Sequence, residues 1–447
     1  MKKNNIAFEI SPFITASGSF GDKSGVYRYM LGLLNEFVKL TKKNKMNLVL
    51  FSFNESALKL PIAPEIFKLI DNKNIFLIDK RKDILLEKGL GLLIKKIFSI
   101  KSNSLFKLIN KIFFIKFFLE DLKNRLKFNS YQKYLTKSLK KFKIKSIFHS
   151  ETGFFKIGDF KNIIVVYDLT PIIFPEFHRR ANRELQGRKL RFIQDFADGI
   201  VCISNHTKKD LLDNFKYLKS KKITVVYPGL DDVFFQSKLR QTYFEDIQTI
   251  IKNKAGKLEK KKYLLYYGTF EPRKNAIQLV KVFSDMQKEG KIPKKFKLIM
   301  SGGEGWGGVK KSIKNFINEN YPIPSKNTIV LLNFLSDDYL ISLIKNAYAI
   351  VYPSLYEGFG LPVLESMALG TPVICSNKSS MPEVGGNSVI YINPKDYFDL
   401  SKKILYLIKR PKIARKLSRR GIKQSKLFNW QISGKKAYNF IQALIQD

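Results

Sequence analysis

The sequence YPSLYEGFGLPVLESMALGTPVI, residues 352–374, has the pattern of a strand, a loop, a helix and a second strand in that order. The first apolar run ends at Pro353, and the loop that follows contains Gly358 and Gly360. Pro362 favours a helix start because its fixed φ suits the first helical turn, and a glycine closes that helix before the next apolar run. This order is typical of proteins whose helices connect the parallel strands of a sheet.

The same alternation extends over most of the 447 residues, which predicts an α/β fold with parallel sheets. After residue 231 the pattern decays into a polar stretch rich in Lys and Gln, and a new series of strands begins at residue 263. We therefore expect two Rossmann-like domains at 1–235 and 263–430, a linker at 236–262 and a last helix in 431–447. The predicted strands are 6–10, 47–53, 146–149, 163–167, 199–204 and 223–227 in the first domain, and 263–267, 296–301, 328–331, 349–353, 372–375 and 389–392 in the second.

The chain is strongly basic, with 80 Lys and Arg against 38 Asp and Glu and a net charge of +42. This charge favours a polyanionic partner, either nucleic acid or an anionic membrane. Between Lys95 and Lys145 lysines interleave with Phe, Ile and Leu at helical spacing, as in a helix that lies in a membrane interface. An ordinary solvated helix packed on a core explains that spacing equally well. No uncharged run reaches the roughly 18–20 residues that span a bilayer, so we expect a soluble or surface-bound protein.

The cysteines and histidines indicate neither a disulfide framework nor a metal site. Cys202 and Cys375 both lie in apolar runs that are predicted to be buried strands, which favours small core residues in a reducing compartment. The three histidines, His149, His178 and His206, are too far apart in sequence to form a metal-binding signature. We therefore expect no metal.

Two carboxylates in the segment 352–374 are candidate ligands for hydroxyl groups. Glu357 lies in the loop and Glu365 lies about one turn into the helix, so both can accept hydrogen bonds from vicinal hydroxyls in one cleft. Gly358 and Gly360 allow backbone N–H groups to approach an anion at the helix N-terminus. Each feature alone is explained as well by a helix dipole or a chain turn. Their combination favours a binding site.

Three further segments follow predicted strands. Arg273 and Lys274, in YGTFEPRKN (267–275), can bind diphosphate oxygens, although exposed basic residues at a helix start are an alternative. The loop GSFGDKSGVYRY (18–29) contains Gly25, and its glycine spacing differs from the G-x-G-x-x-G of nicotinamide enzymes, which weakens an oxidoreductase interpretation. Asp168, in VVYDLTP, either serves the site or caps the next turn.

The segment around Glu357 and Glu365 resembles the family 4 glycosyltransferases, which are retaining enzymes of the GT-B fold with two Rossmann-like domains facing a cleft. Their signature has two glutamates separated by seven residues in an E-G-F-G-L-P-x-L-E context. The resemblance implies that Glu357 contacts donor-sugar hydroxyls and Glu365 the ribose. It also implies that the loop amides lie near the sugar and diphosphate; these belong to Gly358, Phe359, Gly360 and Leu361.

The resemblance extends to the other segments. The sequence 267–275 is similar to the G-T-x-E-P-R-K-N pattern of the mannosyltransferase-like branch, which makes Gly268, Thr269, Arg273 and Lys274 donor-binding candidates. The Gly25 loop is similar to the family's G-G-(I/V)-x-R-Y loop, whose glycine amide faces the donor phosphate. Many relatives have His-Asp where this chain has Tyr167 and Asp168, so the role of that histidine does not carry over. Glu357 and Asp168 remain the catalytic candidates.

The implied activity is transfer of a hexosyl unit, mannosyl being favoured, from a nucleoside-diphosphate sugar such as GDP-mannose to a glycan or lipid-linked acceptor. The implied setting is cell-surface polysaccharide synthesis, in the cytoplasm or at the inner face of the cytoplasmic membrane, without a cofactor. In this interpretation the first domain binds the acceptor and the last helix packs back on it. The alternatives are a sugar-nucleotide epimerase of the same fold and a protein that binds nucleic acid or membrane on an inactive scaffold. Nucleic acid is disfavoured because paired carboxylates repel a polyanion.

Overall fold

The computed structural model of the chain describes residues 4–15, 25–53, 63–70, 72–78, 130–150, 156–178, 180–234, 242–293, 295–320 and 328–446. Its contacts divide these residues into two compact units. The first unit runs to Val165 and also includes Arg191–Ile200 and the residues from Tyr438 on. The second unit comprises Val166–Leu190 and Val201–Ala437.

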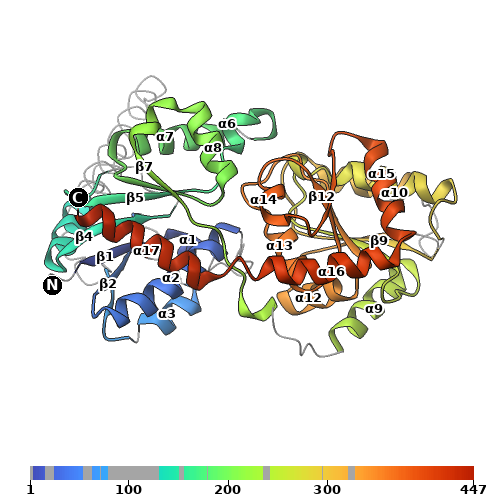
Figure 1. Cartoon of the computed structure of the whole chain (residues 1–447), viewed down its shortest axis with the longest axis horizontal. Helices are drawn as coiled ribbons and strands as arrows, with labels where there is room; N and C mark the ends of the chain where they lie inside the picture. Colours follow the sequence, from blue (N-terminus) through green and yellow to red (C-terminus); the bar gives the residue numbers. More distant parts are fainter. Residues whose placement is uncertain are drawn as a thin grey trace, which may run out of the picture. The chain divides into compact units, whose positions relative to one another are not determined.

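The first sheet has seven strands in the order β3-β2-β1-β4-β5-β6-β7 (Figure 1). The registers of β1 with β2 and β4, of β2 with β3, and of β4 with β5 are all parallel. Its core strands are almost entirely buried and apolar, as expected of a sheet covered on both faces. The strands are β1 (Asn5–Glu9), β2 (Leu48–Phe51), β3 (Ile75–Leu77), β4 (Ile144–His149), β5 (Lys161–Val166), β6 (Gly199–Cys202) and β7 (Lys222–Val225).

The second sheet has six strands in the order β10-β9-β8-β11-β12-β13, and all neighbours in it pair in parallel. The chain winds outward from β8 to β10 and then returns to place β11 on the other side of β8. In doubly wound sheets a ligand binds outside the carboxyl ends of the strands at such a reversal. The strands are β8 (Tyr263–Tyr267), β9 (Lys297–Ser301), β10 (Ile329–Leu332), β11 (Ala349–Tyr352), β12 (Val373–Ser376) and β13 (Ile390–Ile392).

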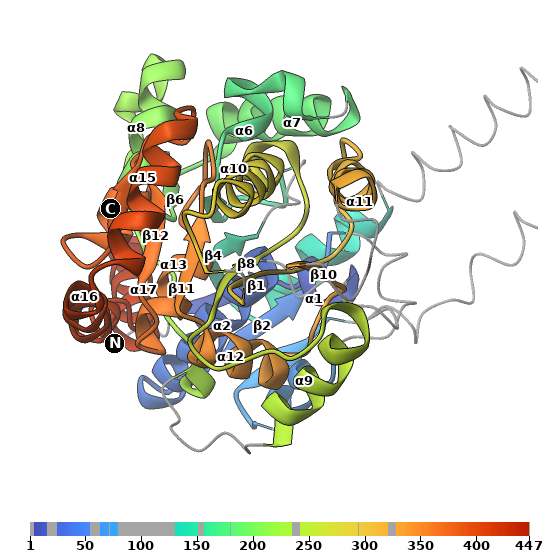
Figure 2. The ribbon, with the colours of Figure 1, turned by 90° about the vertical axis from the view of Figure 1, so that its right-hand side faces the viewer.

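Helices cover both faces of the second sheet, with α10 and α15 on one face and α12, α13 and α16 on the other (Figures 1 and 2). The described helices are α1 (Ser11–Thr15), α2 (Gly25–Lys43), α3 (Pro64–Ile70), α6 (Thr170–Ile173), α7 (Arg180–Phe196), α8 (Asn205–Asn214), α9 (Thr242–Ala255), α10 (Ala276–Lys288), α11 (Val309–Asn320), α12 (Asp337–Asn346), α13 (Leu361–Ala368), α14 (Met381–Gly385), α15 (Tyr397–Ile408), α16 (Pro411–Ser425) and α17 (Trp430–Gln446). Among the described residues, no helix is both long enough and apolar enough to cross a membrane.

The predicted α/β class and its parallel sheets are confirmed, and each predicted strand is present within one or two residues of its predicted bounds. Strand β3 was not predicted, because it has only three residues and lies between polar stretches. The stretch 236–262, predicted to be a linker, contains α9. In the first unit, the end of α17 lies against α2, with the rings of Tyr438 and Phe37 6.4 Å apart. The predicted domain limits stay a prediction.

The basic segment 95–145 is described only from residue 130 on, and its earlier part lies outside the described residues. Residues 130–141 are helical, and every fourth residue of that stretch is buried, namely Tyr131, Leu135 and Leu139. The lysines between them, such as Lys133 and Lys137, face solvent. In residues 130–141, therefore, the structure favours the second of the two alternatives, an ordinary solvated helix packed on a core.

Candidate active site

The carboxylate of Glu357 is buried and is held on both of its oxygens. Its Oε2 forms an ion pair with the Nη1 of Arg273 at 2.7 Å. Its Oε1 accepts hydrogen bonds from the hydroxyls of Tyr352 at 2.8 Å and Ser354 at 3.0 Å. Burial alone would raise the pKa of Glu357, but the charges of Arg273 and Lys274 and these hydrogen bonds outweigh it and lower that pKa. Glu357 is therefore a carboxylate in a fixed orientation.

Arg273 lies between two carboxylates. Besides Glu357, its Nε pairs with Oε2 of Glu271 at 2.8 Å, and its Nη1 also donates to the carbonyl of Tyr356 at 2.9 Å. The side chain of Arg273 is only 13% exposed. Glu271 is buried as well, and burial raises its pKa despite the neighbouring cations. Arg273, a predicted diphosphate ligand, thus commits two of its three nitrogens to protein partners, and its contact with a diphosphate stays a prediction.

Lys274 has a different environment from its neighbour. It is 9% exposed, and no hydrogen bond or ion pair joins its Nζ to the part of the chain that the structure describes. Its Nζ lies over Gly268, 3.2 Å from the position that a Cβ of residue 268 would occupy. The φ of Gly268 is +136°, which side chains rarely adopt. A buried ammonium without a paired anion is costly, so this position suits a cation that receives an anion from a ligand.

The loop that follows β11 presents a run of backbone donors. The N–H groups of Gly358, Phe359, Gly360 and Leu361 form no hydrogen bond within the described residues, and they lead directly into α13. Gly360 adopts a φ of +104°, which turns the chain into the helix. Consecutive amides at a helix N-terminus bind anions well, because their partial positive charges add to that of the helix dipole. The side chain of Phe359 points away into a cluster with Tyr227 and Phe428.

Glu365 lies in α13 and is also buried. The hydroxyl of Tyr267, the last residue of β8, donates to Oε2 of Glu365 at 3.0 Å and to the carbonyl of Pro362 at 2.7 Å. Because β8 and β11 are neighbours, the two predicted glutamates belong to one corner of the second unit. Each of them is oriented by a tyrosine that ends one of these two strands.

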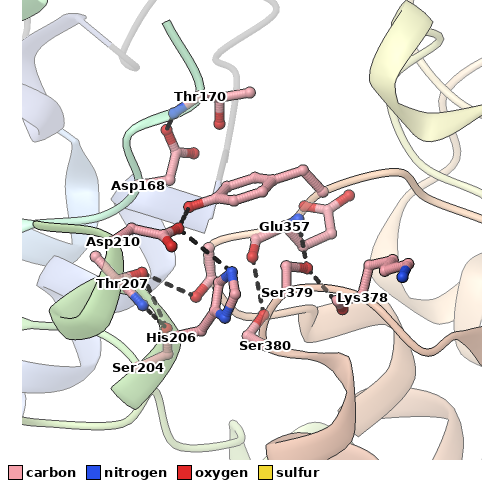
Figure 3. A network of polar contacts seen from close by, with 12 residues as sticks. Asp168, Thr170, Ser204, His206, Thr207, Asp210, Glu357, Lys378, Ser379 and Ser380 are labelled. Atoms are coloured by element: carbon pink, nitrogen blue, oxygen red, sulfur yellow. Dashed lines mark hydrogen bonds and ion pairs between the residues drawn. The ribbon is translucent and has the colours of Figure 1, made fainter. Parts of the chain in front are cut away.

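Asp168 lies in the same unit, after β5. Its Oδ1 accepts the N–H of Thr170 at 3.0 Å, so Asp168 holds the turn that leads into α6 (Figure 3). A Cβ at Gly358 would lie 2.3 Å from the carbonyl oxygen of Tyr167 and 3.1 Å from the Cβ of Asp168. Glycine is therefore required at 358 for this close approach. The side chain of Tyr167 itself lies under Lys189, whose Nζ is 5.1 Å from the ring centroid.

A second set of contacts holds the loop of Glu357 from outside (Figure 3). The hydroxyl of Tyr356 donates to Asp210 at 2.5 Å, and His206 lies 3.3 Å from the same Asp210 oxygen. On the other side, the hydroxyl of Ser379 accepts the N–H of Glu357 at 2.9 Å. The hydroxyl of Ser380 donates to the carbonyls of Glu357 and Phe359 at 2.9 and 2.8 Å. These contacts fix a loop that has no regular secondary structure of its own.

Asn205 of α8 and Glu383 of α14 form a structural contact. The carboxylate of Glu383 accepts the N–H groups of Asn205 at 3.0 Å and His206 at 3.1 Å, at the N-terminus of α8. A carboxylate at this position complements the helix dipole. Cys202 and Cys375 are both buried and free. Burial raises the pKa of Cys202 to about 12, so its thiol is not a nucleophile.

The structure brings most of the predicted site residues together in the second unit. Gly268, Thr269, Arg273 and Lys274 follow β8, and the loop from Glu357 to Leu361 with Glu365 follows β11. Gly25 is the first residue of α2 in the first unit, so its contact with a donor stays a prediction. Sequence reasoning gave no role to the residues that orient the glutamates, which are Tyr267, Tyr352, Ser354, Asp210, Ser379 and Ser380. The two tyrosines could have been found, since both stand at the ends of predicted strands.

Residues 247–424 match the family described as Glycosyl transferases group 1. One curated relative, O-antigen chain mannosyltransferase B of Escherichia coli, is 29% identical over 271 residues, which cover 60% of this chain and 67% of the relative. Another, the serotype-specific mannosyltransferase WbdA of Escherichia coli, is 26% identical over 288 residues, 64% of this chain. That match spans only 34% of the length of WbdA.

Among solved structures, Anabaena HepE in complex with UDP and glucose superposes with a TM-score of 0.62 at 12% identity, over 98% of this chain and all of that one. At this identity the likeness establishes the fold alone. It agrees with the two parallel α/β units of this chain. Residues 247–424 therefore form a glycosyltransferase domain of group 1, in a chain that has the GT-B fold.

Proposed function

We propose that this chain is a retaining glycosyltransferase of family 4 that moves a hexosyl unit, preferentially mannosyl, from a nucleoside-diphosphate sugar to a glycan or lipid-linked acceptor. One observation carries the proposal. The second unit has, in one corner, both the Lys274 ammonium and the backbone amides of 358–361, which form no hydrogen bond within the described residues. Both are donors suited to a diphosphate. The mannosyltransferase relatives favour mannose as the sugar and, through the O-antigen relative, cell-surface polysaccharide synthesis as the setting. GDP-mannose as the donor is our proposal.

In the reaction, the bond between the anomeric carbon and the diphosphate oxygen breaks and a bond to an acceptor hydroxyl oxygen forms. Lys274 and the amides of 358–361 stabilise the negative charge that develops on the departing diphosphate, which is where preorganised donors accelerate a reaction most. The acceptor proton passes to the departing phosphate. Glu357 holds the hydroxyls of the donor sugar, and its ion pair with Arg273 keeps it ionised for that role. Glu365 holds the ribose.

Asp168 is the second catalytic candidate. Its Oδ1 is used by Thr170, and its charge acts on Arg273 and His178. The negative charge of Asp168 therefore acts on Arg273, which holds Glu357. We assign Asp168 an electrostatic role in the transfer. Tyr167, which replaces the histidine of many relatives, is buried beneath Lys189 and takes no part in this scheme.

A thermal-shift screen with GDP-, UDP- and dTDP-sugars tests the donor. We expect GDP-mannose to give the largest shift, because at a fixed concentration a ligand that binds only the folded state raises the melting temperature more the more tightly it binds. The product anomer, determined by NMR after transfer to a synthetic acceptor, tests retention. A larger shift with UDP-glucose would overturn the mannosyl donor. Release of free sugar without a glycoside would favour the epimerase.

A further inference from the structure

The 47 residues from Leu400 to Gln446 contain the strongest local charge imbalance of the described chain. Between Leu400 and Gln446 there are thirteen Lys and Arg and no Asp or Glu. The chain as a whole has one acid for about two bases, so its general basicity does not explain a stretch without any acid. In the second unit this charge is concentrated on α16.

One face of α16 is a continuous stripe of cations, which we call the α16 face. It consists of Lys412, Arg415, Lys416, Arg419, Arg420 and Lys423, all exposed and spaced three or four residues apart. That spacing places them on one side of a helix of 15 residues, about 22 Å long. None of the six forms an ion pair with a carboxylate in the described parts of the chain. Their charge is not neutralised within the molecule.

The opposite side of α16 is buried, so the α16 face points toward solvent. Ala414, Leu417 and Gly421 are buried against α13, and a Cβ at Gly421 would lie 3.2 Å from Met367. The helix cannot rotate about its axis without losing this close packing, which glycine alone permits. The α16 face is therefore a rigid cationic surface on a folded domain.

Exposed apolar side chains follow these cations closely in the sequence. Ile422 of α16 is 39% exposed, and the connection to α17 and its first turn expose Leu427 by 65% and Ile432 by 61%. Large apolar side chains next to a row of Lys and Arg are the composition of helices that lie in the headgroup region of a bilayer. A nucleic-acid backbone would neutralise the cations but offers no apolar partner to these residues.

We propose that the α16 face, with Leu427 and Ile432, docks the protein on the surface of a membrane that contains anionic phospholipid. The cations bind the headgroups, and the apolar side chains enter the region between headgroups and acyl chains. This surface differs from the segment 95–145, in which the described helix 130–141 packs on a core. Transfer to a lipid-linked acceptor would benefit, because the enzyme and its acceptor would share one surface.

Co-sedimentation of the full chain with phosphatidylcholine vesicles, with and without phosphatidylglycerol, tests the proposal. We expect binding only when phosphatidylglycerol is present, with a steep loss as salt is raised. The triple variant Arg415→Gln, Arg419→Gln and Lys423→Gln should bind about 100-fold more weakly, since each cation near an anionic surface contributes about a fivefold factor. The variant Leu427→Ser has the same charge as the parent protein and should also bind these vesicles more weakly than the parent.

A matched control removes the same charge elsewhere. Lys281, Lys311 and Lys314 are exposed on α10 and α11, and their replacement by Gln should leave vesicle binding nearly unchanged. Equal losses in both triple variants, equal binding to neutral vesicles, no vesicle binding, or binding to a DNA duplex in preference to vesicles would each overturn the proposal. GDP-mannose binding by calorimetry should be the same in both variants, so failure of the docking surface is distinguishable from failure of the proposed transfer activity.

Discussion

Glu357 and Glu365 are the same residue type, stand eight positions apart and are both buried, yet the molecule holds them by different means. Glu357 lies in a loop and depends on partners from outside that loop, chiefly Arg273, Tyr352 and Ser379. Glu365 lies in α13, where the helix backbone already fixes its position and Tyr267 adds a hydrogen bond. A carboxylate in a loop needs a surrounding network to become a precise ligand, whereas the backbone of a carboxylate on a helix is already fixed by the helix.

The largest expected effect is on the loop network. Arg273→Met should lower the free energy of unfolding by about 3–5 kcal/mol, because it leaves the buried carboxylates of Glu271 and Glu357 without their shared cation. Urea unfolding measures this effect. Adding Glu357→Gln to Arg273→Met should recover part of the loss, since one of the two uncompensated charges is then gone. A loss below about 1 kcal/mol in the single variant would show that the ion pairs are not structural.

The same network predicts an acid dependence with a definite sign. The pKa of Glu357 is lowered in the folded protein from an ordinary value of 4.5, so its contribution to stability is present above that value and is lost as pH falls below it. Stability measured by urea unfolding from pH 7 downward should therefore fall less steeply in Glu357→Gln than in the parent protein. Equal slopes would contradict the lowered pKa.

Kinetics separate the two glutamates directly. Glu357→Gln should lower kcat by about 100-fold, since contacts near the reacting carbon act mainly in the transition state. Glu365→Gln should chiefly raise the KM for the donor, about tenfold, because a ribose contact acts equally in the ground and transition states. Melting curves are required for Glu357→Gln, which also breaks an ion pair. Unchanged kinetics in both folded variants would mean that the pair is only structural.

The next effect concerns donor affinity and depends on Lys274, which differs from Arg273 in having no ion-pair partner among the described residues. Lys274→Ala should weaken nucleotide-sugar binding by about 1.5–3 kcal/mol, the loss expected for a charge-assisted hydrogen bond. It should change the unfolding free energy little, because the cost of burying the ammonium opposes its attraction to Glu271 and Glu357. Calorimetry with the folded variant measures the first effect, and Lys281→Ala on the surface of α10 is the matched control. Unchanged donor affinity would remove Lys274 from the site.

The smallest effect is expected at the outer support of the loop. Tyr356→Phe removes one hydrogen bond to Asp210 and should cost about 1 kcal/mol of stability with a few-fold fall in kcat. Asp210→Asn should give a similar change. If the two residues act through this contact, the double variant should be no worse than the worse single variant. Additive losses would instead show independent roles.

The sequence could predict the fold because strands and helices leave periodic patterns. The runs at 263–267 and 349–353 are apolar over their whole length, and Pro362 marks the start of α13, so the order of elements is readable from one chain. The position of the candidate site follows from the same reading, since parallel strands place the residues after them at one edge. Strand β3 and helix α9 were missed because one is very short and the other begins in a polar stretch.

The sequence by itself determined that two cations and two glutamates follow neighbouring strands, because local order and periodicity are properties of the chain. Only the tertiary structure decided which of the two cations pairs with the protein's own carboxylates. Arg273 and Lys274 are adjacent and equally charged, so no local rule separates them. The 3₁₀ turn at Pro272–Lys274 directs Arg273 between Glu271 and Glu357, and leaves Lys274 over Gly268. Pairing of charges depends on side-chain direction and on residues more than eighty positions away, and these are fixed only when the strands assemble.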